Sequence, residues 1–96
     1  MLEAIERFVE YLRVERNASH LTLKSYREDL SALTAHLEET GSRCPPLAEI
    51  TTLDLRGFIA ELQQFGYAKS TISRRLACLR SFFRFAVREG WVDSNI

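Results

Sequence analysis

The sequence predicts an all-α protein, because apolar residues recur at helical spacing in four segments and no segment alternates with the period of a strand. Glycines and prolines punctuate the chain between the later segments, at Gly41, Pro45, Pro46, Gly66 and Gly90. At 96 residues, with 46% hydrophobic residues, the chain is long enough to bury one core. We therefore expect residues 1–96 to form a single compact domain of four helices.

The first helix is expected over residues 2–15. Its apolar stripe comprises Leu2, Ile5, Phe8, Val9 and Leu12, and three glutamates (Glu3, Glu6, Glu10) lie together on another face. The second helix should begin after Ser19, a good N-cap residue, and end at Gly41, which suits the position after a helix. It should bury Leu23, Tyr26, Leu30, Leu33 and Leu37. The Pro45–Pro46 pair then predicts an extended connection.

The third helix should begin at Thr51 or Thr52, because Thr51 followed by Asp54 resembles a capping box, and it should stop at Gly66. Its expected buried residues are Leu55, Phe58, Ile59, Leu62 and Phe65. Gly57 lies inside this helix, and its missing side chain would allow another helix to approach closely. The fourth helix should begin after Ser70 and end at Gly90, and Trp91 and Val92 should fold back onto the core.

The fourth helix carries an unusual distribution of charge. Between Leu62 and Arg88 the chain has six basic residues and no acidic one, although the whole sequence has 13 basic and 13 acidic residues and no net charge. Its buried stripe should comprise Ile72, Leu76, Leu79, Phe83, Ala86 and Val87. The arginines would then be exposed with nothing nearby to neutralise them. A positive field concentrated on one helix favours a polyanionic partner such as nucleic acid.

A helical wheel places small residues (Ser73, Ala77, Ser81) at the centre of the exposed face, with arginines around them. Small side chains would let the helix settle into a DNA groove, while arginines reach phosphates or guanine edges. The helix N-terminus adds free backbone N–H groups that suit a phosphate. The residues predicted to contact DNA are Lys24, Arg27, Lys69, Ser70, Thr71, Ser73, Arg74, Arg75, Ala77, Arg80, Ser81, Arg84 and Arg88. A solvated arginine face without a ligand is the alternative interpretation.

Lys24 and Arg27 belong to a smaller patch in the first two turns of the second helix, with His20, Thr22 and Ser25. Glu28 and Asp29 follow this patch and Glu38 and Glu39 occupy the far end, so only the N-terminal half would suit DNA. A mixed-charge amphipathic helix with no ligand explains this patch equally well.

No catalytic or metal-binding constellation is visible in the sequence. Tyr26 lies on a buried stripe, Tyr11 borders the stripe of the first helix, and Tyr67 lies in a turn with no histidine or arginine cluster placed by a motif. Cys44, Cys78, His20 and His36 lack the paired spacing of a zinc site, so no metal or cofactor is predicted. The apolar runs are too short to span a membrane, and the acidic N-terminus does not resemble a signal peptide, so we expect a cytoplasmic protein.

Four stretches of the chain resemble, in order, the N-terminal core-binding domain of tyrosine site-specific recombinases, particularly the Xer type. They are Phe8-x-x-Tyr11-Leu12-x-x-Glu15-Arg16, Ser19-x-x-Thr22-Leu23-x-x-Tyr26-x-x-Asp29-Leu30, Ile50-Thr51-x-x-Asp54-Leu55-x-x-Phe58-Ile59-x-x-Leu62, and Ser70-Thr71-Ile72-x-Arg74-x-Leu76-x-x-Leu79-Arg80-x-Phe82-Phe83-x-Phe85 with Glu89-Gly90. The last stretch is the most specific, because the others are largely amphipathic helices.

This resemblance implies a SAM-like four-helix domain that forms half of a clamp around duplex DNA, with the second and fourth helices crossing the major groove of a recombination half-site. It also implies that the catalytic residues lie in a separate C-terminal domain, so that this chain alone would not be an enzyme. The parent protein would cut and rejoin DNA through a 3′-phosphotyrosyl intermediate. It would assemble with other protomers in a tetrameric synapse, and its expected role is the resolution of chromosome dimers at cell division.

Two other functions remain open at the level of sequence. The same domain serves integrases of phages, integrons and transposons, although a start at Met1 with no arm-binding segment before the first helix favours the Xer type. A helical protein-interaction module that grips an acidic partner through the fourth helix is a more distant alternative.

Overall fold

The computed structural model of the chain describes residues 1–41 and 46–93. These residues form four α-helices and one short 3₁₀ helix, which confirms the all-α prediction. In chain order they are α1 (Leu2–Val14), α2 (His20–Gly41), η1 (Leu47–Glu49), α3 (Thr52–Gln64) and α4 (Lys69–Arg88). Three of the four predicted helices begin within one residue of the expected position.

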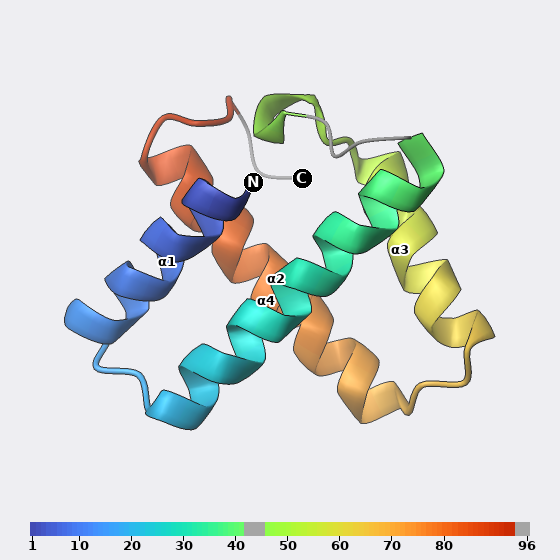
Figure 1. Cartoon of the computed structure of the whole chain (residues 1–96), viewed down its shortest axis with the longest axis horizontal. Helices are drawn as coiled ribbons and strands as arrows, with labels where there is room; N and C mark the ends of the chain where they lie inside the picture. Colours follow the sequence, from blue (N-terminus) through green and yellow to red (C-terminus); the bar gives the residue numbers. More distant parts are fainter. Residues whose placement is uncertain (42–45, 94–96) are drawn as a thin grey trace.

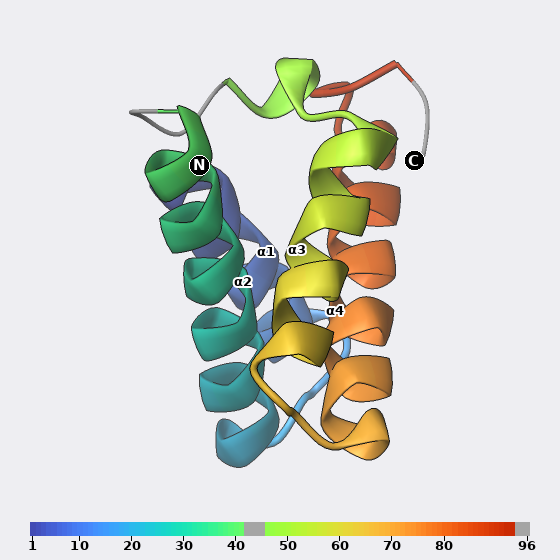
Figure 2. The same cartoon turned by 90° about the vertical axis from the view of Figure 1, so that its right-hand side faces the viewer.

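The two longest helices, α2 and α4, cross each other in the middle of the molecule (Figure 1). They form the two outer layers, and α1 and α3 lie between them on opposite sides of the crossing (Figure 2). Each of these two shorter helices contacts both α2 and α4. The crossing of α2 and α4 therefore organises the whole domain.

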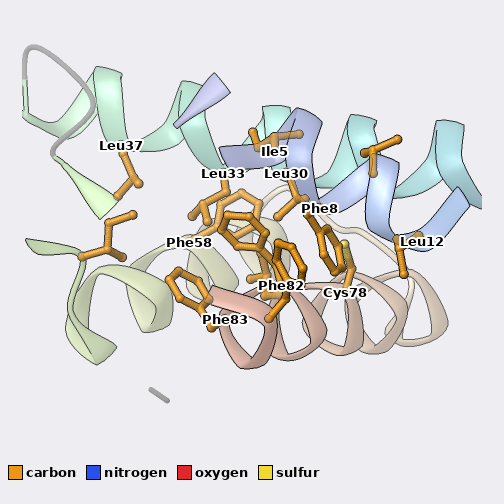
Figure 3. Close-up of a cluster of buried hydrophobic side chains, with 14 of the residues drawn as sticks. Ile5, Phe8, Leu12, Leu30, Leu33, Leu37, Phe58, Cys78, Phe82 and Phe83 are labelled. Atoms are coloured by element: carbon orange, nitrogen blue, oxygen red, sulfur yellow. The ribbon is translucent and has the colours of Figure 1, made fainter. Parts of the chain in front are cut away.

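The core is built from the aromatic residues of α1 and α4 and the leucines of α2 (Figure 3). Phe8 meets Phe82 edge to face at 5.5 Å between ring centroids, and both are at most 1% exposed. Leu30 and Leu33 are completely buried beside them. Burial of a large apolar side chain contributes about 1.5–3 kcal/mol, so this cluster accounts for much of the stability of the fold.

Capping side chains and glycines mark the starts and ends of the helices largely where the sequence predicts them. Ser19 Oγ accepts a hydrogen bond from the backbone N–H of Thr22 at 3.1 Å, and Thr51 and Asp54 form a complete capping box at the start of α3. Gly66 and Gly90 have positive φ angles (81° and 78°), as the residue that terminates a helix often has.

The N-terminus of α4 differs from the prediction. Ala68, rather than Ser70, is the N-cap, and its carbonyl accepts the first intrahelical hydrogen bond from Ile72. Ala68 has extended backbone angles, so the helix is already formed at Lys69. No side chain caps this end.

Two predicted core residues are exposed: Leu2 and Phe65 are each 72% exposed. Each lies at an end of its helix, where no neighbouring helix covers the stripe; Phe65 is the C-cap of α3. Tyr26, Leu55 and Ile59 are half-buried and pack against the core.

The buried face of α4 is also displaced from the predicted stripe. Ile72, Leu76 and Val87 are half-buried, whereas Cys78, Phe82 and Phe85 are buried. The displacement follows from the packing, because α4 contacts α1, α2 and α3 and so buries a wider face than the sequence pattern predicts.

The connections hold two further findings. Pro46 is extended, as expected, but η1 follows it and was not predicted; Pro45 lies outside the described residues. Trp91 folds back as predicted and meets Phe85 edge to face at 5.3 Å.

A Cβ added to Gly57 would lie 3.7 Å from His36 Nε2, which is an ordinary contact, so the packing of α2 against α3 does not require glycine there. His36 Nδ1 and Glu61 Oε2 share a hydrogen bond between these helices.

Candidate nucleic-acid interface

The exposed face of α4 has the composition that the helical wheel predicts. Ser73 and Ala77 are exposed at its centre, and Ser81 is half-buried. Arg80 and Arg84 project from the same face, and neither makes an ion pair with a carboxylate in the part of the chain that the structure describes. This face therefore offers two uncompensated positive charges beside small side chains.

The N-terminal half of α2 crosses α4 on its buried side, next to this exposed face. Cys78 Sγ lies 3.9 Å from the carbonyl oxygen of Tyr26, so the backbones approach closely at the crossing. Lys24 is exposed on α2 and has no ionic partner among residues 1–41 and 46–93. Ser25 is half-buried. Both helices thus present small polar and basic side chains around one crossing point.

The expectation that nothing neutralises the arginines of α4 is wrong for Arg74 and Arg75. Asp29 of α2 is 1% exposed; Arg74 Nη1 lies 3.2 Å from its Oδ2, and Arg75 Nε lies 3.4 Å from its Oδ1. The sequence pattern groups Asp29 with Glu28 as acids that follow the basic patch of α2, but the crossing of α2 over α4 buries Asp29. Burial raises the pKa of Asp29, and the two arginines oppose that increase only in part.

The two arginines differ in how much of each side chain remains available. The Arg74 side chain is 45% exposed, so it can reach solvent while contacting Asp29. The Arg75 side chain is only 16% exposed, and its guanidinium lies over the Tyr67 ring at 4.8 Å. The geometry therefore suits Arg74 to a ligand and Arg75 to holding α4 against α2.

Acidic residues of α1 compensate two more members of the predicted set. Arg27 of α2 makes two hydrogen bonds with Glu6, at 2.9 and 3.0 Å. Arg88 of α4 lies 3.4 Å from Glu15 and 4.6 Å above the Tyr11 ring. These glutamate contacts raise the pKa values of Arg27 and Arg88.

The start of α4 keeps the feature that suggested a phosphate site. Lys69 and Ser70 are exposed, Thr71 is half-buried, and no side chain caps the helix. The first backbone N–H groups of a helix carry partial positive charge, which favours an anion.

A hollow of about 550 Å³ opens beside the crossing, between the end of α1, the start of α2 and the second half of α4. Arg16, Arg84 and Arg88 line it together with Thr22, Tyr26 and Ser81. The predicted set omits Arg16. No local signal could bring it together with Ser81 and Arg84, because these residues of the hollow are more than sixty positions later in the sequence.

The described residues hold no group of three histidine, cysteine or acidic side chains that could bind a metal. Cys78 is buried, and Cys44 lies outside the described residues. Burial raises the pKa of the Cys78 thiol to about 12, which disfavours its reactive thiolate form. Over the residues described, none of the helices has the length and apolar character that crossing a membrane requires.

Comparisons with known proteins agree with this architecture. Residues 5–90 match the family model described as the phage integrase N-terminal SAM-like domain. The chain is 41% identical over 91 residues to tyrosine recombinase XerC of Oceanobacillus iheyensis, covering 95% of this chain and 29% of that protein. It is 36% identical over 90 residues to tyrosine recombinase XerC of Listeria innocua, covering 94% of this chain and 29% of the relative.

A third relative, tyrosine recombinase XerD of Brucella abortus, is 41% identical over 88 residues, which cover 92% of this chain and 28% of that protein. No solved structure matches the chain significantly. The chain thus spans less than a third of the curated relatives it matches. Because the family model covers almost all of the four helices, the chain belongs to the phage integrase N-terminal SAM-like domain family.

Proposed function

We propose that this chain is the DNA-binding domain of a Xer-type tyrosine recombinase and that α2 and α4 enter the major groove of duplex DNA together. The observation that carries the proposal is the exposed face of α4, where Arg80 and Arg84 flank Ser73 and Ala77 and have no carboxylate partner in the described part of the chain. The family membership and the relatives named tyrosine recombinases support it.

The dimensions of α4 suit this role. Its 20 residues give a helix about 30 Å long, which exceeds the width of a major groove of about 12 Å. The small side chains at its centre allow the backbone to lie deep in the groove, and the arginines then reach phosphates or base edges on either side. Lys24 and Arg74 extend the basic surface across the crossing with α2.

The whole recombinase would cut and rejoin DNA through a 3′-phosphotyrosyl intermediate formed by a separate catalytic domain. Four protomers would assemble at paired sites, and the reaction would resolve chromosome dimers at cell division in the cytoplasm. The naming of the relatives as XerC and XerD favours this role over an integrase of a mobile element.

A salt titration of DNA binding tests the role of the exposed face of α4. The fluorescence anisotropy of a labelled half-site duplex should give an affinity that falls with salt by about 0.9 log units per log unit for each phosphate contact. The double variant Arg80→Ala/Arg84→Ala should bind more weakly, and its slope should be smaller by up to about 1.8. Arg74 is left unchanged, because its loss would also disturb the buried Asp29.

The matched control is Arg7→Ala/Arg13→Ala, which removes two exposed arginines from α1 and leaves α4 intact. It should retain the slope of the unmodified chain. If both double variants behave alike, bulk charge and not the α4 face governs binding. If the unmodified chain binds no duplex even at low salt, the proposed function fails, and an acidic protein partner becomes the better interpretation.

A further inference from the structure

The hollow beside the helix crossing has a chemistry that groove binding by α4 does not require. Its walls are largely aromatic and aliphatic, with Leu12, Tyr26, Phe85 and Val87 among them. Its rim carries Arg16 and Arg84, and no acidic residue lines it. Flat apolar walls next to two cations are complementary to a flat, apolar group that bears an anion.

The two rim arginines are available to a ligand. Arg16 and Arg84 are exposed, and neither pairs with a carboxylate within residues 1–41 and 46–93. The third arginine of the hollow, Arg88, is held by Glu15 and by the Tyr11 ring. Thr22 and Ser81 line the same space, and a hydroxyl group can donate to an anion.

The hollow is shaped before any ligand arrives. Asn17 has a φ angle of 49°, a left-handed conformation that asparagine tolerates, and the Ala18 N–H bonds to the Leu12 carbonyl at 3.0 Å. This turn fixes the path of the chain at Arg16, between the end of α1 and the start of α2. Phe8 stacks on Tyr26 at 6.1 Å, and Tyr11 packs on Phe85 at 4.7 Å, so the walls are supported from within.

We infer that this hollow binds a single nucleotide unit, with its base against the apolar walls and its phosphate between Arg16 and Arg84. A volume of about 550 Å³ lies in the range of about 300–1,000 Å³ typical of small-molecule sites and is far larger than a phosphate alone needs. Guanidinium groups are suited to phosphate, and aromatic side chains bind bases without sequence preference. The nucleotide could be free or an unpaired residue of a bound DNA strand. The second source rests on the proposed function.

Amide chemical shifts of the isotope-labelled 96-residue chain provide the test, with adenosine 5′-monophosphate, adenosine and inorganic phosphate as separate probes. The monophosphate should give saturable shifts at Arg16, Thr22 and Ser81 and bind more tightly than either fragment. The Arg16→Gln variant should weaken this binding about tenfold, as the loss of one charge-assisted contact to phosphate implies. The control Arg13→Gln removes an arginine near the same helix end that pairs with Glu10 and lies outside the hollow, and it should bind normally.

Three results would overturn the inference: no saturable response to the monophosphate, equal binding of the monophosphate and inorganic phosphate, or equal weakening by both variants. Two duplexes then distinguish the sources, one fully paired and one with a single unpaired adenosine. If the duplex with the unpaired adenosine binds more tightly, and Arg16→Gln removes this difference, the hollow binds an unpaired nucleotide of DNA. If both duplexes bind equally, the ligand of the hollow is a free nucleotide. The paired duplex also separates the two proposals, because its failure to bind counts against the proposed function alone.

Discussion

Arg74 of α4 donates a hydrogen bond at 3.2 Å to the carboxylate of Asp29 on α2, which is almost completely buried while the arginine is nearly half exposed. The contact joins the two crossing helices at the edge of the proposed DNA-binding face. Arg75 approaches the other carboxylate oxygen from the protein side. One buried acid therefore fixes the relative position of both helices.

We predict that Arg75→Ala destabilises the domain by about 1–3 kcal/mol. The substitution removes the better-shielded of the two charges that face Asp29, and it also removes the packing of the guanidinium on Tyr67. Urea denaturation followed by circular dichroism measures the loss. Arg80→Ala is the matched control on the same helix and should change the free energy of unfolding by less than about 0.5 kcal/mol. Equal losses in the two variants would contradict a structural role for Arg75.

The raised pKa of Asp29 predicts a specific pH dependence. The folded state holds the Asp29 proton more tightly than the unfolded state, whose pKa is about 3.9. Unfolding therefore releases this proton between about pH 4 and the raised pKa, and wild-type stability falls as pH rises through that interval.

The Asp29→Asn variant has no carboxyl group at this position and therefore no such titration. Its free energy of unfolding relative to wild type should increase as pH rises from about 4, and then level off above the raised pKa. Urea titrations at several pH values measure the difference. Glu28→Gln controls for the loss of one exposed negative charge on the same helix. A difference that falls with pH would show that attraction to the arginines outweighs the cost of burial.

Cys78 should be nearly inert toward alkylating reagents in the folded protein. Its thiol is completely buried, and its pKa is raised to about 12, mainly by burial, so at pH 8 the thiolate is scarce and inaccessible. The Cys44→Ser variant leaves Cys78 as the single thiol, and mass spectrometry follows its reaction with iodoacetamide. The same variant in denaturing urea should react rapidly. Similar rates in both solvents would show that the core around Cys78 opens readily.

Removing the cap of α3 should cost about 1 kcal/mol. In the Thr51→Ala variant the Asp54 N–H loses its acceptor, the Thr51 hydroxyl, at 3.1 Å. Thr52→Ala is the appropriate control, because Thr52 is the first residue of the helix and is also exposed. Thermal unfolding should rank Thr51→Ala clearly below Thr52→Ala. The reverse order would place the start of α3 one residue later.

The sequence was sufficient to predict the helices and most of the core, because helical periodicity and capping are local properties. The burial of Phe8, Leu30 and Phe58 could be predicted for that reason. The partners of the arginines could not be predicted in the same way. Asp29 and Arg74 are 45 residues apart, and only the crossing of α2 over α4 brings them together. The same holds for Arg16, which shares a hollow with residues more than sixty positions later in the chain.

Two glutamates, Glu6 of α1 and Glu15 at the C-cap of α1, act as internal counterions of the domain. Glu6 and Glu15 occupy the places beside Arg27 and Arg88 that dissolved anions would otherwise fill. A DNA phosphate that reached either arginine would displace a carboxylate of the same chain. No dissolved ion would be released or taken up at that arginine, so the contact would add nothing to the salt dependence. The slope of DNA affinity against salt concentration should therefore reflect only the arginines and lysines that have no carboxylate partner. A protein with no net charge can in this way still bind a polyanion through one helix.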